Sequence, residues 1–229
     1  MQSKIKSGVS PIFQFSCFAS TVLHLLPPTM LHIFLNRLLD SDRWLFKKIN
    51  SEWTNPLFDS LLPFMRESLH WAPLYLFLIV FITLNFKNGW WWVLFFICTV
   101  SLTDMTGTYL FKHNFERLRP CMDPDFYTQV RLVINRCSGG FSFISNHAAN
   151  HFGMTAFAFF TFKNHFTSSW FKLIFLWPAL IAYAQVYIGV HYPLDVFCGS
   201  LVGLCIGFLV SRFFNKRYGI IIFGKQPEY

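Results

Sequence analysis

Long apolar segments limit what this chain can fold into. Four of them, Leu69–Phe86, Trp90–Phe111, Ser169–Tyr187 and Tyr192–Phe213, approach or meet the length of about 20 mostly apolar residues that a helix needs to cross a bilayer. A fifth segment, His147–Phe162, begins with polar residues and then becomes apolar. In lipid a chain must satisfy its own backbone polar groups, which favours helices over open strands. The sequence therefore predicts an all-α integral membrane bundle.

Composition excludes several other classes of protein. Of the 229 residues, 54% are hydrophobic and 13% are charged, whereas a soluble domain has about 25% charged residues. An intrinsically disordered chain, a small disulfide scaffold and an ordinary soluble enzyme are excluded. The net charge is +8, but the basic residues are scattered, and we expect no nucleic-acid partner. In membrane proteins such residues set topology and attract anionic headgroups.

The N-terminal third leaves three alternatives open. Pro11–Leu26 is apolar, Pro27 and Pro28 interrupt it, and the apolar run resumes at Met30–Leu35. This stretch is a kinked sixth span, a signal-like segment, or an extension upstream of a start at Met30. We therefore expect five or six transmembrane helices. The chain divides into an N-terminal segment (1–35), a membrane domain (36–213) and a cytoplasmic tail (214–229).

The segment from Asn36 to Ser68 alternates apolar and charged residues. This pattern is typical of an amphipathic helix that lies in the plane of the membrane interface. Asn55-Pro56 interrupts it, since this dipeptide favours a turn.

Helix alternation divides the connections between two membrane faces. The turns at 87–89 and 163–168 and the tail from Arg212 fall on one face, and the connections at 112–146 and 188–191 fall on the other. Both faces carry many Lys and Arg residues, so their number does not decide orientation. Because several basic residues on the second face have a further role in ligand binding, we assign the first face to the cytoplasm.

Three polar segments meet on the second face. They are Lys112–Pro120, Phe143–His147 and Ala184–Asp195, and each stands at the end of an expected helix. Polar groups at this depth are costly unless they bind something. Lys112 and Arg119 supply positive charge for an anion, and Arg binds a phosphoryl group with two parallel hydrogen bonds.

The remaining groups suit phosphate chemistry. The backbone N–H groups of Ser145 and Asn146 precede a helix, where the dipole favours an anion. Of His147 and His191, one attacks phosphorus and the other protonates the leaving oxygen. Asp195 lies one helical turn after His191 and orients its ring. We expect no metal and no cofactor, since the cations are built into the chain.

These residues resemble a known signature. Lys112-x6-Arg119-Pro120, Ser145-x-His147 and Gly189-x-His191-x3-Asp195 are similar to the three motifs of the type 2 phosphatidic acid phosphatase family, which vanadium haloperoxidases share. The resemblance covers roughly residues 36–213.

The resemblance implies a mechanism. It makes His191 the nucleophile that forms a phosphohistidine, Asp195 its orienting group and His147 the general acid. It assigns phosphate binding to Lys112 and Arg119, together with the backbone near Ser145 and Asn146.

Two of the three motifs depart from the family pattern. The second motif has Ile144-Ser145-Asn146-His147 where the family usually has Pro-Ser-Gly-His. The third opens with Ala184-Gln185 where the family usually has Ser-Arg. Gln185 can donate to phosphate but carries no charge, and Arg117 and Arg136 are the candidates to replace that charge.

Two further pairs of residues have a spacing that suits a functional role. His147 and His151 have a spacing that suits metal ligands, but no third ligand is evident. Cys121 and Cys137 bracket a polar segment. If their face is periplasmic, oxidising conditions favour a disulfide, and the alternative is two free thiols.

The sequence thus predicts a lipid phosphatase in a bacterial inner membrane, with its site facing the periplasm. The favoured substrate is undecaprenyl pyrophosphate, as in the short bacterial undecaprenyl-pyrophosphate phosphatases. One alternative is a lipid A or phosphatidylglycerophosphate phosphatase. Another, of a different class, is a non-catalytic lipid-phosphate binding protein. The oligomeric state is not predicted.

Overall fold

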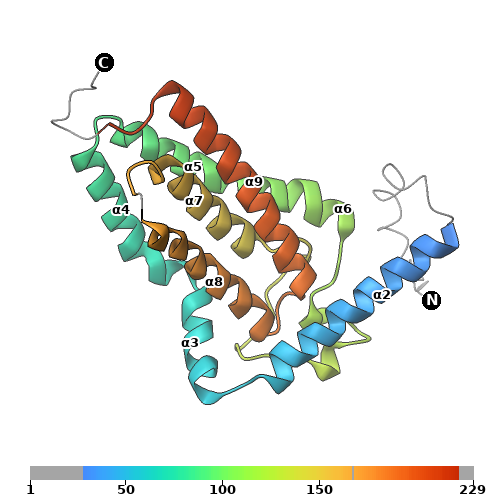
Figure 1. Cartoon of the computed structure of the whole chain (residues 1–229). Helices are drawn as coiled ribbons and strands as arrows, with labels where there is room; N and C mark the ends of the chain where they lie inside the picture. Colours follow the sequence, from blue (N-terminus) through green and yellow to red (C-terminus); the bar gives the residue numbers. More distant parts are fainter. Residues whose placement is uncertain (1–27, 167, 222–229) are drawn as a thin grey trace, which may run out of the picture.

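The computed structural model describes residues 28–166 and 168–221. All regular elements in these ranges are helical, which confirms the all-α prediction. Short 3-10 and π-helical segments join the α-helices. The α-helices, shown in Figure 1, are α2 (Pro28–Lys47), α3 (Pro56–Arg66), α4 (Ala72–Asn85), α5 (Gly89–Met105), α6 (His113–Phe115), α7 (Asn146–Phe162), α8 (Leu176–Tyr187) and α9 (Pro193–Arg217).

Four helical segments in the described ranges are long and apolar enough to cross a membrane. They are Ser68–Asn85, Gly89–Met122, Ser169–Tyr187 and Pro193–Arg217, and they coincide with the four apolar runs of the sequence. The fifth expected span corresponds to α7, whose 17 residues are at the short end of the spanning range, so that span stays a prediction. The candidate sixth span, Pro11–Leu26, lies outside the described residues.

Helix α7 occupies the centre of the bundle, where it contacts α5, α8 and α9 (Figure 1). Its packing against α9 depends on glycines four residues apart. A Cβ atom on Gly203 would lie 2.2 Å from the carbonyl oxygen of Ala149, and one on Gly207 would lie 2.3 Å from that of Gly153. Small residues allow such close backbone approach between membrane helices. The contact holds the N-termini of α7 and α9 side by side.

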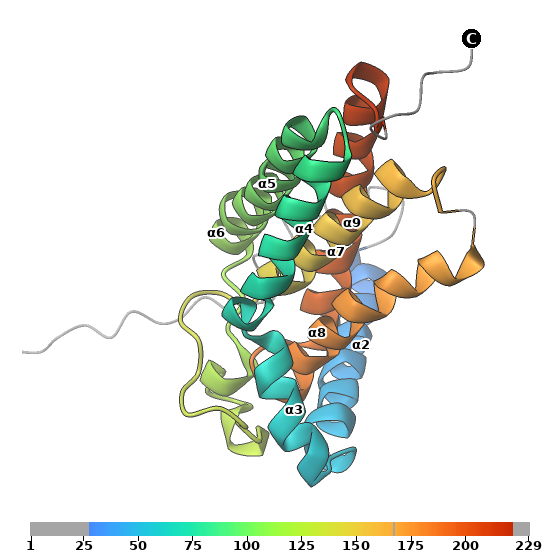
Figure 2. The same ribbon diagram turned by 90° about the vertical axis from the view of Figure 1, so that its left-hand side faces the viewer.

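The N-terminal helices lie at the same end of the molecule as these two N-termini. α2 runs without a break across residue 35, the predicted end of the N-terminal segment. The interruption at Asn55-Pro56 begins α3: Asn55 Oδ1 accepts a 2.9 Å hydrogen bond from the Phe58 N–H, and Pro56 is the first helical residue. Figure 2 shows α3 beside the irregular segment that follows α6.

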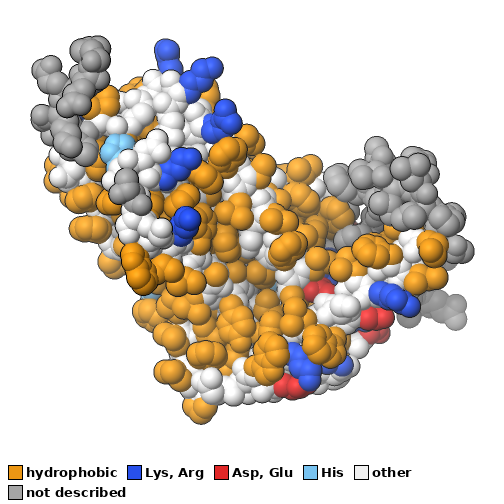
Figure 3. All heavy atoms as spheres, in the orientation of Figure 1, with side chains coloured by type: hydrophobic (Ala, Val, Ile, Leu, Met, Phe, Trp, Pro, Cys, Tyr) orange, Lys and Arg blue, Asp and Glu red, His pale blue; other side chains and the backbone are white. Residues whose placement is uncertain are grey.

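The surface agrees with a membrane location. Orange apolar side chains cover much of the face seen in Figure 3, and Lys and Arg gather at the end where α9 finishes. α9 continues to Arg217, so the first residues of the expected tail, which begins at 214, are helical. Lys216 and Arg217 lie in its last turn.

Candidate active site

A tight turn between α8 and α9 builds the first part of the site. Gly189 has a φ of +93°, and a Cβ atom there would lie 2.9 Å from Val130 Cγ1. The backbone N–H groups of Val190 and His191 both donate to the Gln185 carbonyl oxygen at 3.2 Å. A left-handed conformation of this kind favours glycine. The turn therefore presents His191 just before α9 begins.

His191 faces a carboxylate from the first turn of α9. Its Nδ1 lies 3.6 Å from Asp195 Oδ2, and Ser142 Oγ donates to that same oxygen while lying 3.3 Å from Nδ1. The Tyr192 N–H also donates to Asp195 Oδ2, at 2.9 Å. His191 is 2% exposed and Asp195 is fully buried. These contacts fix the imidazole with Nδ1 toward the carboxylate.

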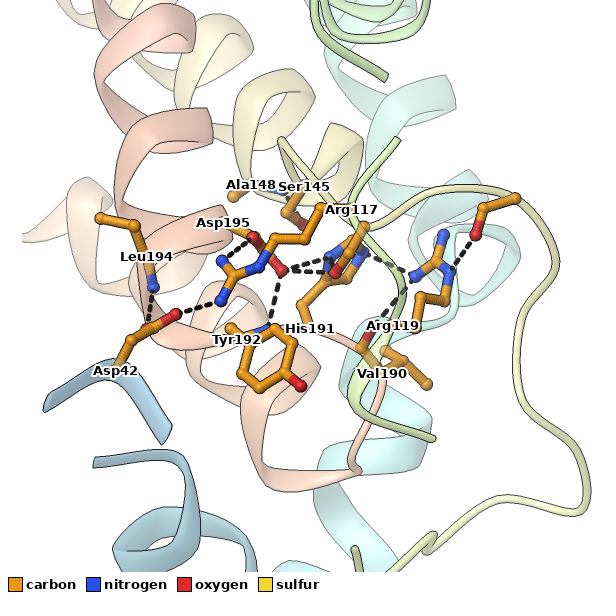
Figure 4. A network of polar contacts seen from close by, with 12 residues as sticks. Asp42, Arg117, Arg119, Ser145, Ala148, Val190, His191, Tyr192, Leu194 and Asp195 are labelled. Atoms are coloured by element: carbon orange, nitrogen blue, oxygen red, sulfur yellow. Dashed lines mark hydrogen bonds and ion pairs between the residues drawn. The ribbon is translucent and has the colours of Figure 1, made fainter. Parts of the chain in front are cut away.

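Arg117 supports this carboxylate from the other side, as Figure 4 shows. Its two terminal nitrogens lie 2.6 Å from Asp195 Oδ1 and 2.6 Å from Asp42 Oδ2. Asp42 Oδ1 accepts a 2.7 Å hydrogen bond from the Leu194 N–H. Burial raises the pKa of Asp42, and Arg117 opposes that effect. Because both terminal nitrogens are engaged, Arg117 is not the replacement for the charge missing at Gln185.

Arg119 contacts the other ring nitrogen of His191. One terminal nitrogen lies 2.9 Å from Nε2 and donates to the Val190 carbonyl at 3.1 Å, and Nε donates to the Gly140 carbonyl at 3.1 Å. Arg119 is 6% exposed. Burial lowers the pKa of His191 to about 4, although Asp195 acts to raise it. The ring is thus neutral at pH 7, with its proton on Nδ1 and a lone pair on Nε2.

His147 lies in the first turn of α7, close enough to His191 and Lys112 to interact with both electrostatically. Lys112 in turn interacts with Arg119 and with Asp195. The structure therefore brings together residues of all three sequence motifs. Two histidines and two cations around one point can transfer a phosphoryl group.

Ser145 is hydrogen bonded within the chain. Its backbone N–H already donates to the Asp195 carbonyl oxygen at 3.0 Å, so it is engaged without any ligand. Its side chain accepts from the Ala148 N–H and caps α7. Ser145 thus connects α7 to α9, and phosphate binding by its N–H stays a prediction.

Two of the residues that depart from the motif pattern, Asn146 and Gln185, differ in how their side chains are paired. Asn146 Nδ2 donates to Asp104 Oδ1 at 2.8 Å and to Thr108 Oγ1 at 2.9 Å, which ties α7 to the helix before it. Its Oδ1 is buried without a hydrogen-bond partner among the described residues. Gln185 is fully buried, and in the described part of the chain both polar atoms of its amide lack a partner.

Two cavities adjoin these groups. One of about 530 Å³ lies between α4, α5 and α7 and reaches His147. Most of its lining surface is apolar and includes Ile79, Phe96 and Val100, although polar residues such as Asp104 and Asn150 also line it. The second, of about 550 Å³, is lined by Arg66, Glu67 and the loop 134–139. The first suits a hydrocarbon chain and the second suits a polar group.

The remaining candidates are placed as follows. Cys121 and Cys137 form a disulfide with a Cα–Cα distance of 6.0 Å. His151 hydrogen bonds to the His147 carbonyl through Nδ1, at 2.8 Å, and to Tyr75 through Nε2, at 3.2 Å. Within residues 28–166 and 168–221, no three His, Cys, Asp or Glu side chains are grouped to hold a metal ion.

Sequence reasoning missed three residues of this region. Asp42 stands in the amphipathic segment, where its charge resembles that of a solvated face. Ser142 lies outside the motif pattern, and its neighbours give no signal. Arg66 is a basic residue at a helix end, flanked by Glu67, and such pairs are common on surfaces.

Comparison with known proteins gives consistent matches. A model of the PAP2 superfamily matches residues 89–218. A lipid A 4'-phosphatase of Porphyromonas gingivalis is 31% identical over 76% of this chain and 73% of its own length. A lipid A 4'-phosphatase of Bacteroides thetaiotaomicron is 28% identical over 65% of this chain and 66% of its own length.

Two solved structures share the fold. A transmembrane PAP2-type phosphatidylglycerolphosphate phosphatase from Bacillus subtilis has a TM-score of 0.60 at 21% identity, covering 90% of this chain and 96% of that chain. Aquifex aeolicus LpxE has a TM-score of 0.53 at 26% identity, covering 73% of this chain and 93% of that chain.

Proposed function

This chain belongs to the PAP2 superfamily of membrane lipid phosphatases, and on that premise we propose that it removes the 4'-phosphate from a lipid A-type glycolipid. The observation that carries the proposal is the series of side-chain contacts from Asp195 through His191 to Arg119, with His147 nearby. These contacts hold a neutral imidazole against a phosphate-binding cation, as nucleophilic attack on phosphorus requires.

In the first half of the reaction His191 Nε2 attacks phosphorus. Because the Arg119 guanidinium contacts Nε2 at 2.9 Å, it must turn toward the phosphoryl oxygens when substrate binds. The N–P bond forms as the bond from phosphorus to the sugar oxygen breaks. His147, which takes up a proton when the phosphate anion binds beside it, gives that proton to the sugar oxygen. The charge that develops on His191 is stabilised by Asp195.

In the second half, water attacks the phosphorus of the phosphohistidine. His147, now neutral, accepts the proton of this water, and the N–P bond breaks. Inorganic phosphate leaves, and both histidines return to their starting states. Lys112 and Arg119 stabilise the phosphoryl charge in both halves.

The relatives favour lipid A over undecaprenyl pyrophosphate, the substrate preferred on sequence grounds. Both curated relatives reported above are lipid A 4'-phosphatases. The chemistry separates the two substrates. A sugar hydroxyl is a poor leaving group and needs a proton from His147, whereas the phosphate that leaves a pyrophosphate needs it much less. Lipid A is therefore the proposed substrate, and undecaprenyl pyrophosphate is the alternative.

We propose that the site faces the periplasm. The opposite end of the bundle holds the basic last turn of α9 with Lys216 and Arg217, and Figure 3 shows Lys and Arg gathered there. Basic residues favour the cytoplasmic side of a membrane. The apolar cavity that reaches His147 gives a hydrocarbon chain of the substrate a place beside the reacting phosphate.

The test is phosphate release by the purified protein in detergent with EDTA present. Lipid A, phosphatidylglycerophosphate and undecaprenyl pyrophosphate are compared for the wild type, His191→Ala and His151→Ala. We expect lipid A to be hydrolysed fastest and His191→Ala to lose activity by about 1,000-fold or more. His151→Ala tests for a simple packing effect. Faster release from undecaprenyl pyrophosphate would contradict the lipid A proposal. Equal rates in wild type and His191→Ala would contradict the histidine mechanism, and no release from any of the three lipids would indicate a non-catalytic binder.

A further inference from the structure

Arg66, at the end of α3, is a cation near the site that no motif includes. It lies outside the segment 89–218 that the superfamily model matches. Its Nε is buried and has no hydrogen-bond partner among the described residues. A buried guanidinium nitrogen without a partner is costly, and such groups are usually satisfied by a ligand or by another polar group.

The residues that line the two cavities show where Arg66 lies. Arg66 lines the polar cavity together with the loop 134–139, and Gly140, the next residue of that loop, accepts the hydrogen bond from Arg119 Nε. Ser68, two residues after Arg66, lines the apolar cavity that contains His147. Arg66 therefore stands where the two cavities approach the site, on the side of Arg119.

Electrostatic contacts agree with this placement. The charge of Arg66 acts on Arg119 and on His147. A second, partly buried cation near Arg119 is unfavourable in the absence of an anion, because like charges in a region of low dielectric repel. An anion with several oxygens, bound between them, removes that repulsion.

The third motif lacks its usual charge because Gln185 stands where the family has Arg, and Arg117 is engaged by Asp42 and Asp195. We propose that Arg66 supplies this charge: its guanidinium binds the scissile phosphoryl group together with Lys112 and Arg119. The inference rests on the proposed phosphatase function and adds a substrate-binding residue from a different part of the chain.

Arg136 offers a matched control. It lines the same polar cavity as Arg66, but it is exposed. If any arginine of that cavity served the phosphate, Arg66→Gln and Arg136→Gln would weaken binding equally. If Arg66 alone binds the phosphoryl group, the two variants differ.

The experiment measures binding of orthovanadate, which mimics the five-coordinate phosphorus of the reaction, by titration calorimetry of the purified full chain. We expect Arg66→Gln to weaken binding at least about tenfold, as for the loss of one charge-assisted hydrogen bond, and Arg136→Gln to stay within about twofold. Adding Gln185→Arg to Arg66→Gln should recover most of the loss, because the charge returns at the family's position. Arg66→Lys, which keeps the charge, should show an intermediate loss.

The outcomes separate the two proposals. Wild-type protein that binds no vanadate and releases no phosphate from any lipid contradicts the phosphatase function itself. Wild-type protein that binds vanadate while Arg66→Gln binds equally well overturns the role of Arg66 alone. If Arg66→Gln does not fold, as judged by size-exclusion chromatography, Arg66→Lys and the double variant decide, and a double variant that folds without recovered binding also overturns the inference.

Discussion

The two sides of the candidate site differ in how completely their polar groups are paired. On the nucleophile side (Asp42, Arg117, Ser142, His191 and Asp195), side chains are linked in one continuous set of hydrogen bonds and ion pairs. On the phosphate side, buried polar atoms of Arg66, Asn146 and Gln185 have no partner among the described residues.

This difference matches the demands of the reaction. A nucleophile must be held in one orientation before the substrate arrives, since correct geometry supplies much of the rate. Groups that bind the phosphoryl oxygens must instead stay available, and they gain their partners only when the substrate is present. Arg119 stands between the two sides, with its guanidinium on His191 Nε2.

A substitution on the nucleophile side should have the largest effect on activity. Asp195→Asn removes the charge that faces His191 Nδ1 and leaves Arg117 with Asp42 alone. We expect kcat to fall by about 1,000-fold, because the imidazole loses its orientation and the stabilisation of its positive form. The measurement is phosphate release from the best lipid substrate under single-turnover conditions.

Asp59→Asn is the matched control for that variant. Asp59 pairs with Arg131 at 2.8 Å, but its side chain is 39% exposed, and such surface pairs contribute little. Activity of Asp59→Asn should therefore stay within a few-fold of wild type. An Asp195→Asn variant that keeps more than about a tenth of wild-type activity would show that the carboxylate does not orient His191.

The same contrast explains what the sequence predicted well. His191 and Asp195 are four residues apart, and the structure places their side chains 3.6 Å apart, as that spacing predicted. The apolar runs likewise predicted the four candidate spans, since the bilayer sets helix length. Local pattern was sufficient wherever function depends on neighbours along the chain.

The rest depended on contacts between distant segments. Asp42 reaches Arg117 across 75 positions and the Leu194 N–H across 152, so its burial was not visible in the amphipathic pattern around it. The hydrogen bond from the Ser145 N–H to the Asp195 carbonyl oxygen likewise depends on the packing of α7 on α9. The four-residue spacing of Gly199, Gly203 and Gly207, which brings these helices together, was the one signal available for that contact.

The pH dependence of kcat/KM tests whether His191 is buried on the nucleophile side, and the expected effect is smaller than that of Asp195→Asn. Burial lowers the pKa of His191 to about 4, so protonation of the nucleophile should remove activity only in acid. We expect the acid limb of kcat/KM, which reports protonation of His191, to lie near 4 and not at the usual histidine pKa of about 6.5. The measurement is kcat/KM between about pH 3.5 and about pH 7, a range that includes both the lowered and the usual histidine pKa. Circular dichroism over the same range is the control for folding. An acid limb near 6.5 would mean that the nucleophile is solvated rather than held in the buried network.

The smallest expected effect concerns the loop that joins the two sides. The disulfide between Cys121 and Cys137 closes a loop across 16 positions, and it begins two residues after Arg119. Closing a loop of this size contributes about 3 kcal/mol to stability, which is a large fraction of the stability of a typical domain.

Because Arg119 is also held by Gly140 and Val190, Cys121→Ser with Cys137→Ser should lower the thermal midpoint by several degrees yet reduce kcat only a few-fold. The exposed free cysteine Cys205 supplies the control, since Cys205→Ser should change neither quantity. A loss of kcat as great as that of Asp195→Asn would mean that the loop, rather than the backbone contacts of Arg119, fixes the phosphate side.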